Sequence, residues 1–124
     1  MSARYLLIIA HGSRRAASND EVRALGERLR AMREPSIDQV EVSFLELAAP
    51  SIPEGLARCA EQGAQEIIVF PYFLAAGTHV ANDIPAALAI FREDHPEIQV
   101  RLASHLGASA SLARTILDVA NLPD

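Results

Sequence analysis

The chain has 124 residues, half of them hydrophobic, and a formal net charge of −5 at pH 7. This length suits one compact domain, which we expect to span residues 1–124. The negative charge argues against general affinity for nucleic acid or anionic membranes. No apolar run approaches the roughly 20 residues of a membrane-spanning helix. The single Cys59 can form no internal disulfide, which fits a cytoplasmic protein.

Four segments have the composition of β-strands. Residues 5–10 and 67–70 are continuously apolar, as expected for strands that helices cover on both faces. The run 5–10 is too short for a secretory signal. Residues 39–44 and 99–102 alternate between apolar and polar side chains, which favours positions at the edges of the sheet. The first and third strands are therefore expected at the centre.

Helical patterns lie between the strands and after the last one. The expected helices run from a capping box at Ser18–Glu21 to Pro35, from a second capping box at Ser51–Glu54 to Gly63, over 82–93 and over 109–120. This alternation predicts parallel strands joined by helical crossovers. We expect an α/β fold with a small open parallel sheet of four strands in the order 2-1-3-4, flavodoxin-like, with helices on both faces.

Histidines follow three of the four expected strands. In an open parallel sheet, ligands bind beyond the carboxyl ends of the strands where the strand order reverses, here between the first and third strands. His11 directly follows the first strand, and His79 lies in the loop after the third. Glu46 follows the second strand and His105 the fourth. Because imidazole both ligates divalent metals and accepts protons, His11 and His79 are the candidate metal ligands and catalytic groups, with Glu46 as a third catalytic candidate.

Each of these side chains also has a structural interpretation. His11 could cap or hydrogen-bond its loop, and Glu46 could be a solvated carboxylate at a strand end. For His105 we favour a structural or rim role. His95 precedes the fourth strand, at the opposite edge of the sheet, and is expected in solvent. Cys59 is expected inside a helix, facing the core and unreactive.

An anionic substrate is suggested by the residues after His11. Arg14 and Arg15 could attract it or could simply decorate the loop, and Gly12, Ser13 and nearby helix N-termini could offer backbone N–H groups. The sequence contains no Walker A motif and no G-x-G-x-x-G, so nucleotide binding has no specific support. It also lacks the G-x-S-x-G of serine hydrolases.

Three segments carry a resemblance to a known family. Residues 7–14 read LIIAHGSR, residues 44–51 read FLELAAPS, and residues 71–80 read PYFLAAGTHV, followed by DIP at 83–85. In this order they closely resemble the CbiX family of small class II chelatases, which includes sirohydrochlorin cobaltochelatases and ferrochelatases. The similarity runs from the first strand almost to the end of the chain.

The resemblance implies a chelatase that inserts a divalent metal, Co²⁺ first among the candidates, into sirohydrochlorin for cobalamin. Iron for sirohaem and nickel for a related cofactor are the alternatives. His11 and His79 match the family's metal-site histidines, and Glu46 matches a nearby acidic residue. The metal is a substrate, and no permanent cofactor is expected. Longer members fuse two such halves, so this chain should pair as a homodimer.

Substrate contacts are expected from Ser13, Arg14 and Arg15, and from Gly77 and Thr78 directly before His79. Two further readings compete with an enzyme. A carrier would bind metal or tetrapyrrole without chemistry. A receiver-like signalling domain would have an acidic cluster after the first strand, where Ala10 and His11 stand instead.

Overall fold

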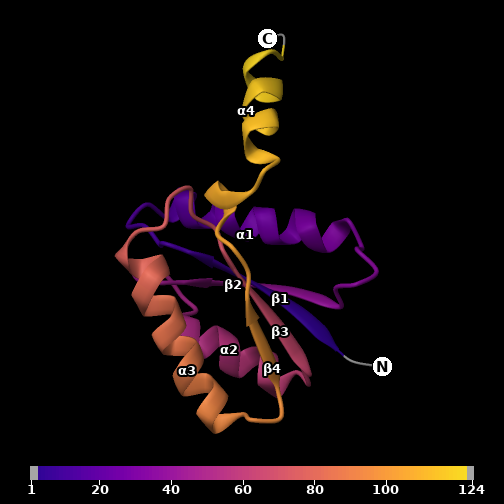
Figure 1. The fold of residues 1–124 in the computed structure, drawn as a ribbon, viewed down its shortest axis with the longest axis vertical. Coiled ribbons are helices and arrows are strands. Elements are labelled where there is room, and N and C mark those ends of the chain that lie inside the picture. The colour runs from indigo at the N-terminus through magenta and orange to yellow at the C-terminus, as the bar shows by residue number, and fades with distance from the viewer. Residues whose placement is uncertain (1–2, 123–124) are drawn as a thin grey trace.

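One parallel four-stranded sheet forms the centre of the computed structural model, which describes residues 3–122 without the side chains of residues 79 and 80. Its strands are β1 (Arg4–Ala10), β2 (Gln39–Phe44), β3 (Glu66–Pro71) and β4 (Gln99–Leu102). They lie in the order β2-β1-β3-β4, and every neighbouring pair is parallel. The predicted strand order is confirmed (Figure 1).

Helices cover both faces of this sheet, as expected (Figure 1). The α-helices are α1 (Ala16–Ala31), α2 (Ile52–Glu61), α3 (Ile84–Asp94) and α4 (Leu112–Ala120). A π-helical turn, η1 (His79–Asp83), leads into α3, and a 3-10 turn, η2 (Leu106–Ala108), precedes α4. Helix α1 lies on one face, and α2 and α3 lie on the other (Figure 1). No helix among residues 3–122 is long and apolar enough to cross a membrane.

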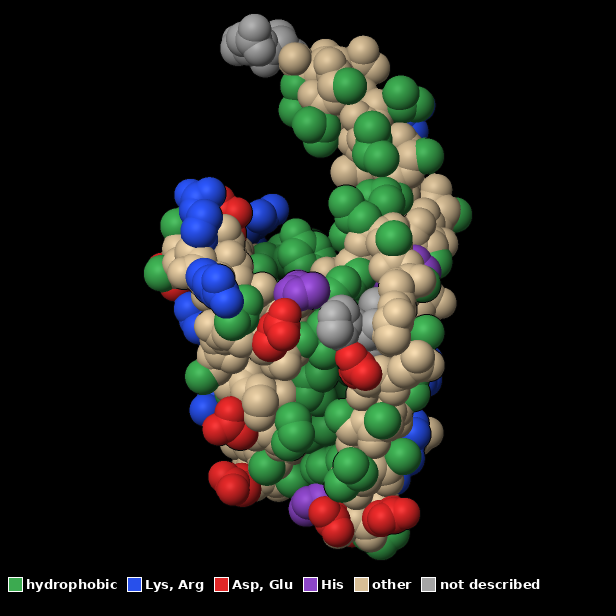
Figure 2. Space-filling view, turned by 90° about the vertical axis from the view of Figure 1, so that its left-hand side faces the viewer, with side chains coloured by type: hydrophobic (Ala, Val, Ile, Leu, Met, Phe, Trp, Pro, Cys, Tyr) green, Lys and Arg blue, Asp and Glu red, His purple; other side chains and the backbone are tan. Residues whose placement is uncertain are grey.

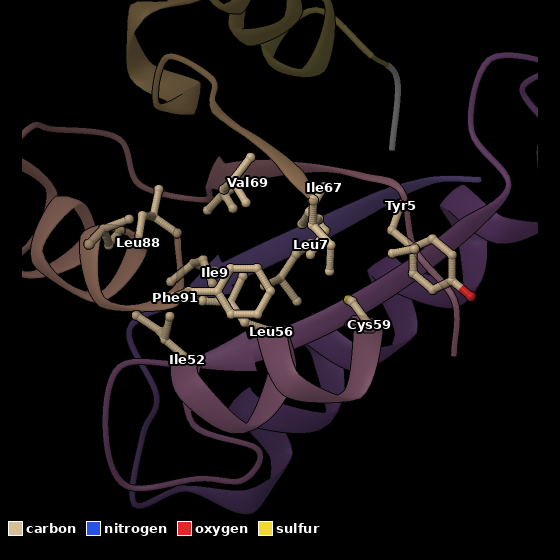
Figure 3. Packing of buried hydrophobic residues seen from close by; sticks show 14 residues of the cluster. Tyr5, Leu7, Ile9, Ile52, Leu56, Cys59, Ile67, Val69, Leu88 and Phe91 are labelled. Atoms are coloured by element: carbon tan, nitrogen blue, oxygen red, sulfur yellow. The ribbon is translucent and has the colours of Figure 1, made fainter. Parts of the chain in front are cut away.

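The main core lies between the sheet and the pair α2 and α3 (Figure 3). Alternate side chains of β1 and β3 point into it because successive residues of a strand face opposite sides of the sheet. Its fully buried members are Leu7, Ile9, Leu56, Cys59, Ile67, Val69 and Ile84. The opposite side chains of β3, Ile68 and Phe70, are only half-buried. The side chains on the sheet face that α1 covers are thus less completely buried.

Of the two predicted capping boxes, the structure contains the one at α2 and not the one at α1. At α2 the Ser51 hydroxyl accepts from the Glu54 N–H at 3.2 Å, and the Glu54 carboxylate accepts from the Ser51 N–H at 2.8 Å. The bond from the Ser51 backbone lowers the pKa of Glu54. At α1 the prediction is wrong, because the helix already begins at Ala16 and Ser18 lies in its first turn. The Ser18 N–H donates to the Arg15 carbonyl instead.

Helix α4 does not fold back onto the sheet. It points away from the rest of the chain and packs against η2 (Figure 1). Its apolar side chains Ile116, Leu117 and Val119 are at least half exposed, at 57, 50 and 64%. The prediction placed a helix here, but the sheet of this chain does not cover its apolar stripe.

Cys59 faces the core from α2, as predicted, and is fully buried. Burial raises the pKa of its thiol to about 12, so the reactive thiolate is scarce near neutral pH. We expect iodoacetamide to alkylate Cys59 in the native protein at least about a hundredfold more slowly than in the unfolded chain. Mass spectrometry of timed reactions, with and without guanidinium chloride, measures both rates. Equal rates would show that the thiol is accessible.

Candidate functional site

The candidate site lies at the carboxyl edge of the sheet, where the loops after β1, β2 and β3 begin. Strand β1 connects toward β2 on one side, and β3 connects toward β4 on the other, so the strand order reverses between β1 and β3. His11 is the first residue after β1, and Glu46 lies two residues beyond β2. The structure brings these two predicted residues together.

His11 and Glu46 are in direct contact. The Nε2 atom of His11 lies 3.1 Å from the Oε1 atom of Glu46, and each side chain is 52% exposed. The ring of Phe73, from the loop after β3, lies 6.3 Å from the His11 ring at 59°. A carboxylate beside an imidazole can orient the ring and stabilise its protonated form. The pair is therefore suited to accepting a proton, and it is open to solvent where a ligand could approach.

The backbones of the two loops are also joined. The N–H of Leu45 donates to the Ala10 carbonyl at 2.9 Å, and the N–H of Glu46 donates to the His11 carbonyl at 3.2 Å. Gly12 has a φ of +94°, and a Cβ atom there would lie 1.7 Å from the Glu46 carbonyl oxygen. Only glycine fits this close approach at this φ. The ladder between β1 and β2 thus continues into the site and sets the spacing of its two side chains.

The loop that carries His11 is held by Asn19, a residue that sequence analysis did not single out. The amide oxygen of Asn19 accepts from the Ser13 N–H at 2.9 Å, and its amide nitrogen donates to the Ser13 carbonyl at 2.8 Å. Asn19 is only 7% exposed. An asparagine inside an amphipathic helix gives no sequence signal for such a role, because its partners lie outside the helix.

The second predicted histidine, His79, begins the π-helical turn η1. Its side chain lies outside the described part of the structure. The carbonyl of Gly77 accepts from the Ala81 N–H at 3.0 Å, and Gly77 and Thr78 are exposed. Among the described side chains, no group of three or more His, Cys, Asp or Glu residues could hold a metal ion. The described part of the candidate metal site is therefore the pair of His11 and Glu46.

Two basic residues follow His11 in the same loop. Arg14 and Arg15 are exposed, and Arg15 is the N-cap residue of α1. Ser13 is half-buried, and its hydroxyl accepts from the Arg15 N–H at 3.0 Å. Figure 2 shows basic side chains on one side of a hollowed face that also carries histidine, acidic and apolar side chains below the projecting α4. Positive charge at a helix N-terminus suits the carboxylates of an anionic ligand.

A pocket of about 310 Å³ opens next to Glu46. Its lining includes Glu46 and Ser51 from the β2–α2 connection, and Asp83 from the end of η1. Two carboxylates in one half-open pocket make its potential negative, which attracts cations. The site thus has an acidic side at the pocket and a basic side at Arg14 and Arg15.

The remaining histidines lie apart from the pair of His11 and Glu46. His105 is half-buried and is the N-cap residue of η2 at the same edge. His95 follows α3 at the opposite edge, as predicted, and its side chain is only partly in solvent, at 34% exposure. Its ring stacks on that of Phe91 at 4.5 Å and 24°, and its Nδ1 atom lies 3.5 Å from Glu97. Stacking on the Phe91 ring shields one face of the imidazole from water.

An open parallel sheet with helices on both faces belongs to the doubly wound α/β class. Ligands of such proteins bind beyond the carboxyl ends of the strands, where His11 and Glu46 lie. The family model described as CbiX matches residues 5–121, so the chain belongs to the CbiX family. The resemblance seen in the sequence motifs is confirmed.

Curated relatives include chelatases for two metals. The chain is 37% identical over 90 residues to the sirohydrochlorin cobaltochelatase of Methanocaldococcus jannaschii, covering 73% of this chain and 62% of that one. Sirohydrochlorin ferrochelatases are also among the relatives, and the chain spans 43% of the one from Priestia megaterium. The chain thus spans less than two thirds of the length of these relatives.

Solved structures share the fold. The structure of a putative cobalamin biosynthesis CbiX protein from Marinobacter aquaeolei VT8 matches with a TM-score of 0.78 and 32% identity, over 94% of this chain and 93% of that one. The sirohydrochlorin chelatase SirB from Bacillus subtilis subspecies spizizenii, in complex with cobalt, matches with a TM-score of 0.83 and 29% identity. That match covers 94% of this chain and 49% of SirB.

Proposed function

We propose that this chain is a sirohydrochlorin chelatase that inserts Co²⁺ into the tetrapyrrole during cobalamin biosynthesis. The observation that carries the proposal is the contact of 3.1 Å between His11 and Glu46 at the carboxyl edge of the sheet in a CbiX-family fold. The names of relatives such as the Methanocaldococcus jannaschii cobaltochelatase support the substrate and the metal.

The proposed chemistry follows from what metal insertion requires. Two pyrrole N–H protons must leave as the ion enters, so the site needs a proton acceptor and a weakly bound metal. In this proposal His11 and His79 hold the incoming ion, and as it passes to the macrocycle their freed imidazole nitrogens take up the two protons, while Glu46 orients the His11 ring. A thiolate would bind the metal too tightly for release. The single cysteine, Cys59, is buried in the core, which suits a site without sulfur ligands.

Substrate binding is assigned to the residues around the pair. Sirohydrochlorin carries several carboxylates, and the exposed Arg14 and Arg15 supply positive charge next to His11. The Ser13 hydroxyl and the N-terminus of α1 add hydrogen-bond donors. We place Gly77 and Thr78 on the opposite side of the bound macrocycle, because they directly precede His79 in the loop after β3.

Iron is the second candidate metal, because sirohydrochlorin ferrochelatases are among the relatives. Imidazole ligands do not separate Co²⁺, Fe²⁺ and Ni²⁺ by type. We expect visible absorption spectra to show metallated product with Co²⁺ at the highest rate, and product in many-fold excess over protein. Anaerobic assays with each metal in turn measure this. A faster reaction with Fe²⁺ would assign the chain to sirohaem synthesis, and binding without turnover would make it a carrier.

We further propose that two copies of the chain, each a single domain over residues 1–124, form a homodimer in the cytoplasm. The exposed apolar stripe of α4 and the half-buried Ile68 and Phe70 on the α1 side of the sheet support this pairing. Both surfaces lose water if a second copy covers them. Relatives of about twice the length, such as the Priestia megaterium enzyme, also support an assembly of two such units.

Charge on the apolar stripe of α4 should break the dimer. We expect the wild type to have twice the chain mass of 13.4 kDa in light scattering, and Ile116→Glu to be monomeric at the same concentration. Arg114→Glu puts the same side chain on the opposite, charged face of α4, where Arg114 bonds to Asp118, and should stay dimeric. A monomeric wild type, or dissociation of both variants alike, would contradict the assignment of α4 to the interface.

A further inference from the structure

Two side chains on neighbouring turns of α1 contact the two loops of the candidate site. Asn19 and Arg23 are four residues apart, so they lie on the same face of the helix. Asn19 binds both backbone groups of Ser13, in the loop that carries His11. Since an amide that both donates and accepts fixes the peptide plane it contacts, this loop has little freedom to rotate.

Arg23 contacts the loop of residues 45–50, which carries Glu46. This loop is closed at its base by the Phe44 N–H, which donates to the Pro50 carbonyl at 2.9 Å. The Nη2 atom of Arg23 donates to the Ala49 carbonyl at 3.0 Å, and its guanidinium carbon lies 5.1 Å from the centre of the Phe44 ring. Arg23 therefore contacts the chain on both sides of the loop.

The orientation of the Arg23 guanidinium is itself set by α1. Its Nη1 atom donates to the Asp20 carboxylate at 2.9 Å, one turn earlier in the helix. A guanidinium can stack flat on a ring while its fixed, planar donors point at two acceptors, whereas an ammonium group has no plane to stack. The contact to the loop is thus made from a group that the helix holds in place.

We propose that Asn19 and Arg23 are positioning residues, which together hold the loops of His11 and Glu46 at the spacing that the reaction needs. Neither touches the reacting atoms. Asn19 fixes the path of residues 11–15, and Arg23 fixes the path of residues 45–50. Both side chains project from the first two turns of α1. In its kinetic consequences the inference rests on the proposed function.

The same helix supplies a matched control. Arg30, two turns further along α1, donates from Nη1 to Glu27 and from Nη2 to the Val40 carbonyl. Arg23 makes the same two kinds of contact, to a carboxylate one turn earlier in α1 and to a backbone carbonyl at or after β2. Val40 lies near the start of β2, away from the carboxyl edge. Removing Arg30 should therefore affect α1 packing without affecting the site loops.

The test compares Arg23→Ala, Arg23→Lys, Asn19→Asp and Arg30→Ala as full-length proteins. Amide hydrogen exchange follows the N–H groups of Leu45 and Glu46, which bond to the β1 side. We expect Arg23→Ala to speed their exchange at least about fivefold, and Arg30→Ala to leave it within about twofold. Asn19→Asp replaces the donor to the Ser13 carbonyl with a carboxylate oxygen that repels this carbonyl. The loop should therefore move away from residue 19, and exchange at Ser13 and Arg15 should speed up.

The kinetic arm uses sirohydrochlorin and Co²⁺. Since small displacements of reacting groups are costly, kcat/KM should fall about tenfold in Arg23→Ala and in Asn19→Asp, and remain near the wild-type value in Arg30→Ala. Arg23→Lys should recover part of the loss, because an ammonium group can still donate to Ala49.

Equal exchange and equal kinetics in Arg23→Ala and Arg30→Ala would overturn the assignment of Arg23 and leave it a role in α1 packing only. Unchanged exchange of the Ser13 N–H in Asn19→Asp would overturn the assignment of Asn19 as a positioning residue. Because the exchange arm needs neither metal nor tetrapyrrole, it decides these outcomes even if the wild-type chain inserts no metal.

Discussion

Replacing His11 with alanine should lower the rate of Co²⁺ insertion into sirohydrochlorin by at least about a hundredfold, because one side chain is proposed to supply both a metal ligand and a proton acceptor. The side chain is half exposed and lies in a loop, so its removal leaves no core cavity. The melting temperature should therefore change little. Initial rates from visible absorption, measured beside thermal unfolding, separate the two effects.

His95→Ala is the control for this change. It removes the same residue type from the opposite edge of the sheet, where the ring stacks on Phe91 at 4.5 Å. We expect it to lower stability slightly and to leave the insertion rate within about twofold. A His11→Ala protein that worked at the wild-type rate would remove this residue from the mechanism.

Gly12→Ala should damage both the fold and the activity. An alanine Cβ would lie 1.7 Å from the Glu46 carbonyl oxygen, at a φ of +94° that L-residues rarely adopt. We expect the free energy of unfolding to fall by about 2–4 kcal/mol, since strain and a backbone clash add. The insertion rate should fall at least about tenfold, because the loop of Glu46 must move away from His11. Urea denaturation and the absorption assay measure the two quantities.

Gly63→Ala is the control that adds the backbone strain of a positive φ without a clash against a neighbouring carbonyl. Gly63 has a nearly equal φ of +97°, but a Cβ there would meet no atom within 4 Å, and the residue lies after α2. We expect it to cost about 1–2 kcal/mol of stability and no activity. If Gly12→Ala and Gly63→Ala cost the same and both stay active, the close approach of the two loops has no functional importance.

The sheet could be predicted from the sequence because its signals are local. Continuous apolar runs marked β1 and β3 as central strands, and alternation marked β2 and β4 as outer strands. The simplest connection of these four strands then gave the order that the structure has. The Ser51 capping box was also predicted correctly, since its two partners are three residues apart. The Ser18 box matched the same pattern but failed, because helical geometry already extends back to Ala16.

Other features depend on contacts that no local pattern encodes. The bond from Arg23 to Ala49 joins residues 26 apart, and the Asn19 amide meets Ser13 across a turn outside the helix. The position of α4 was not predictable either. Its apolar stripe indicates a buried helix, yet the sequence does not say whether this chain or another one covers it. The proximity of His11 and Glu46 could be predicted only from the strand order, because each residue follows one of two neighbouring strands.

The most direct test of the site is nuclear magnetic resonance of the histidine rings during titration with Co²⁺, whose unpaired electrons broaden and shift nearby signals. The chain has only four histidines, so each ring can be assigned by substitution. We predict that the signals of His11 and His79 broaden first and that His95, at the opposite edge of the sheet, keeps its signal. Loss of the His95 signal before that of His11 would contradict the placement of the metal at the edge where His11 contacts Glu46.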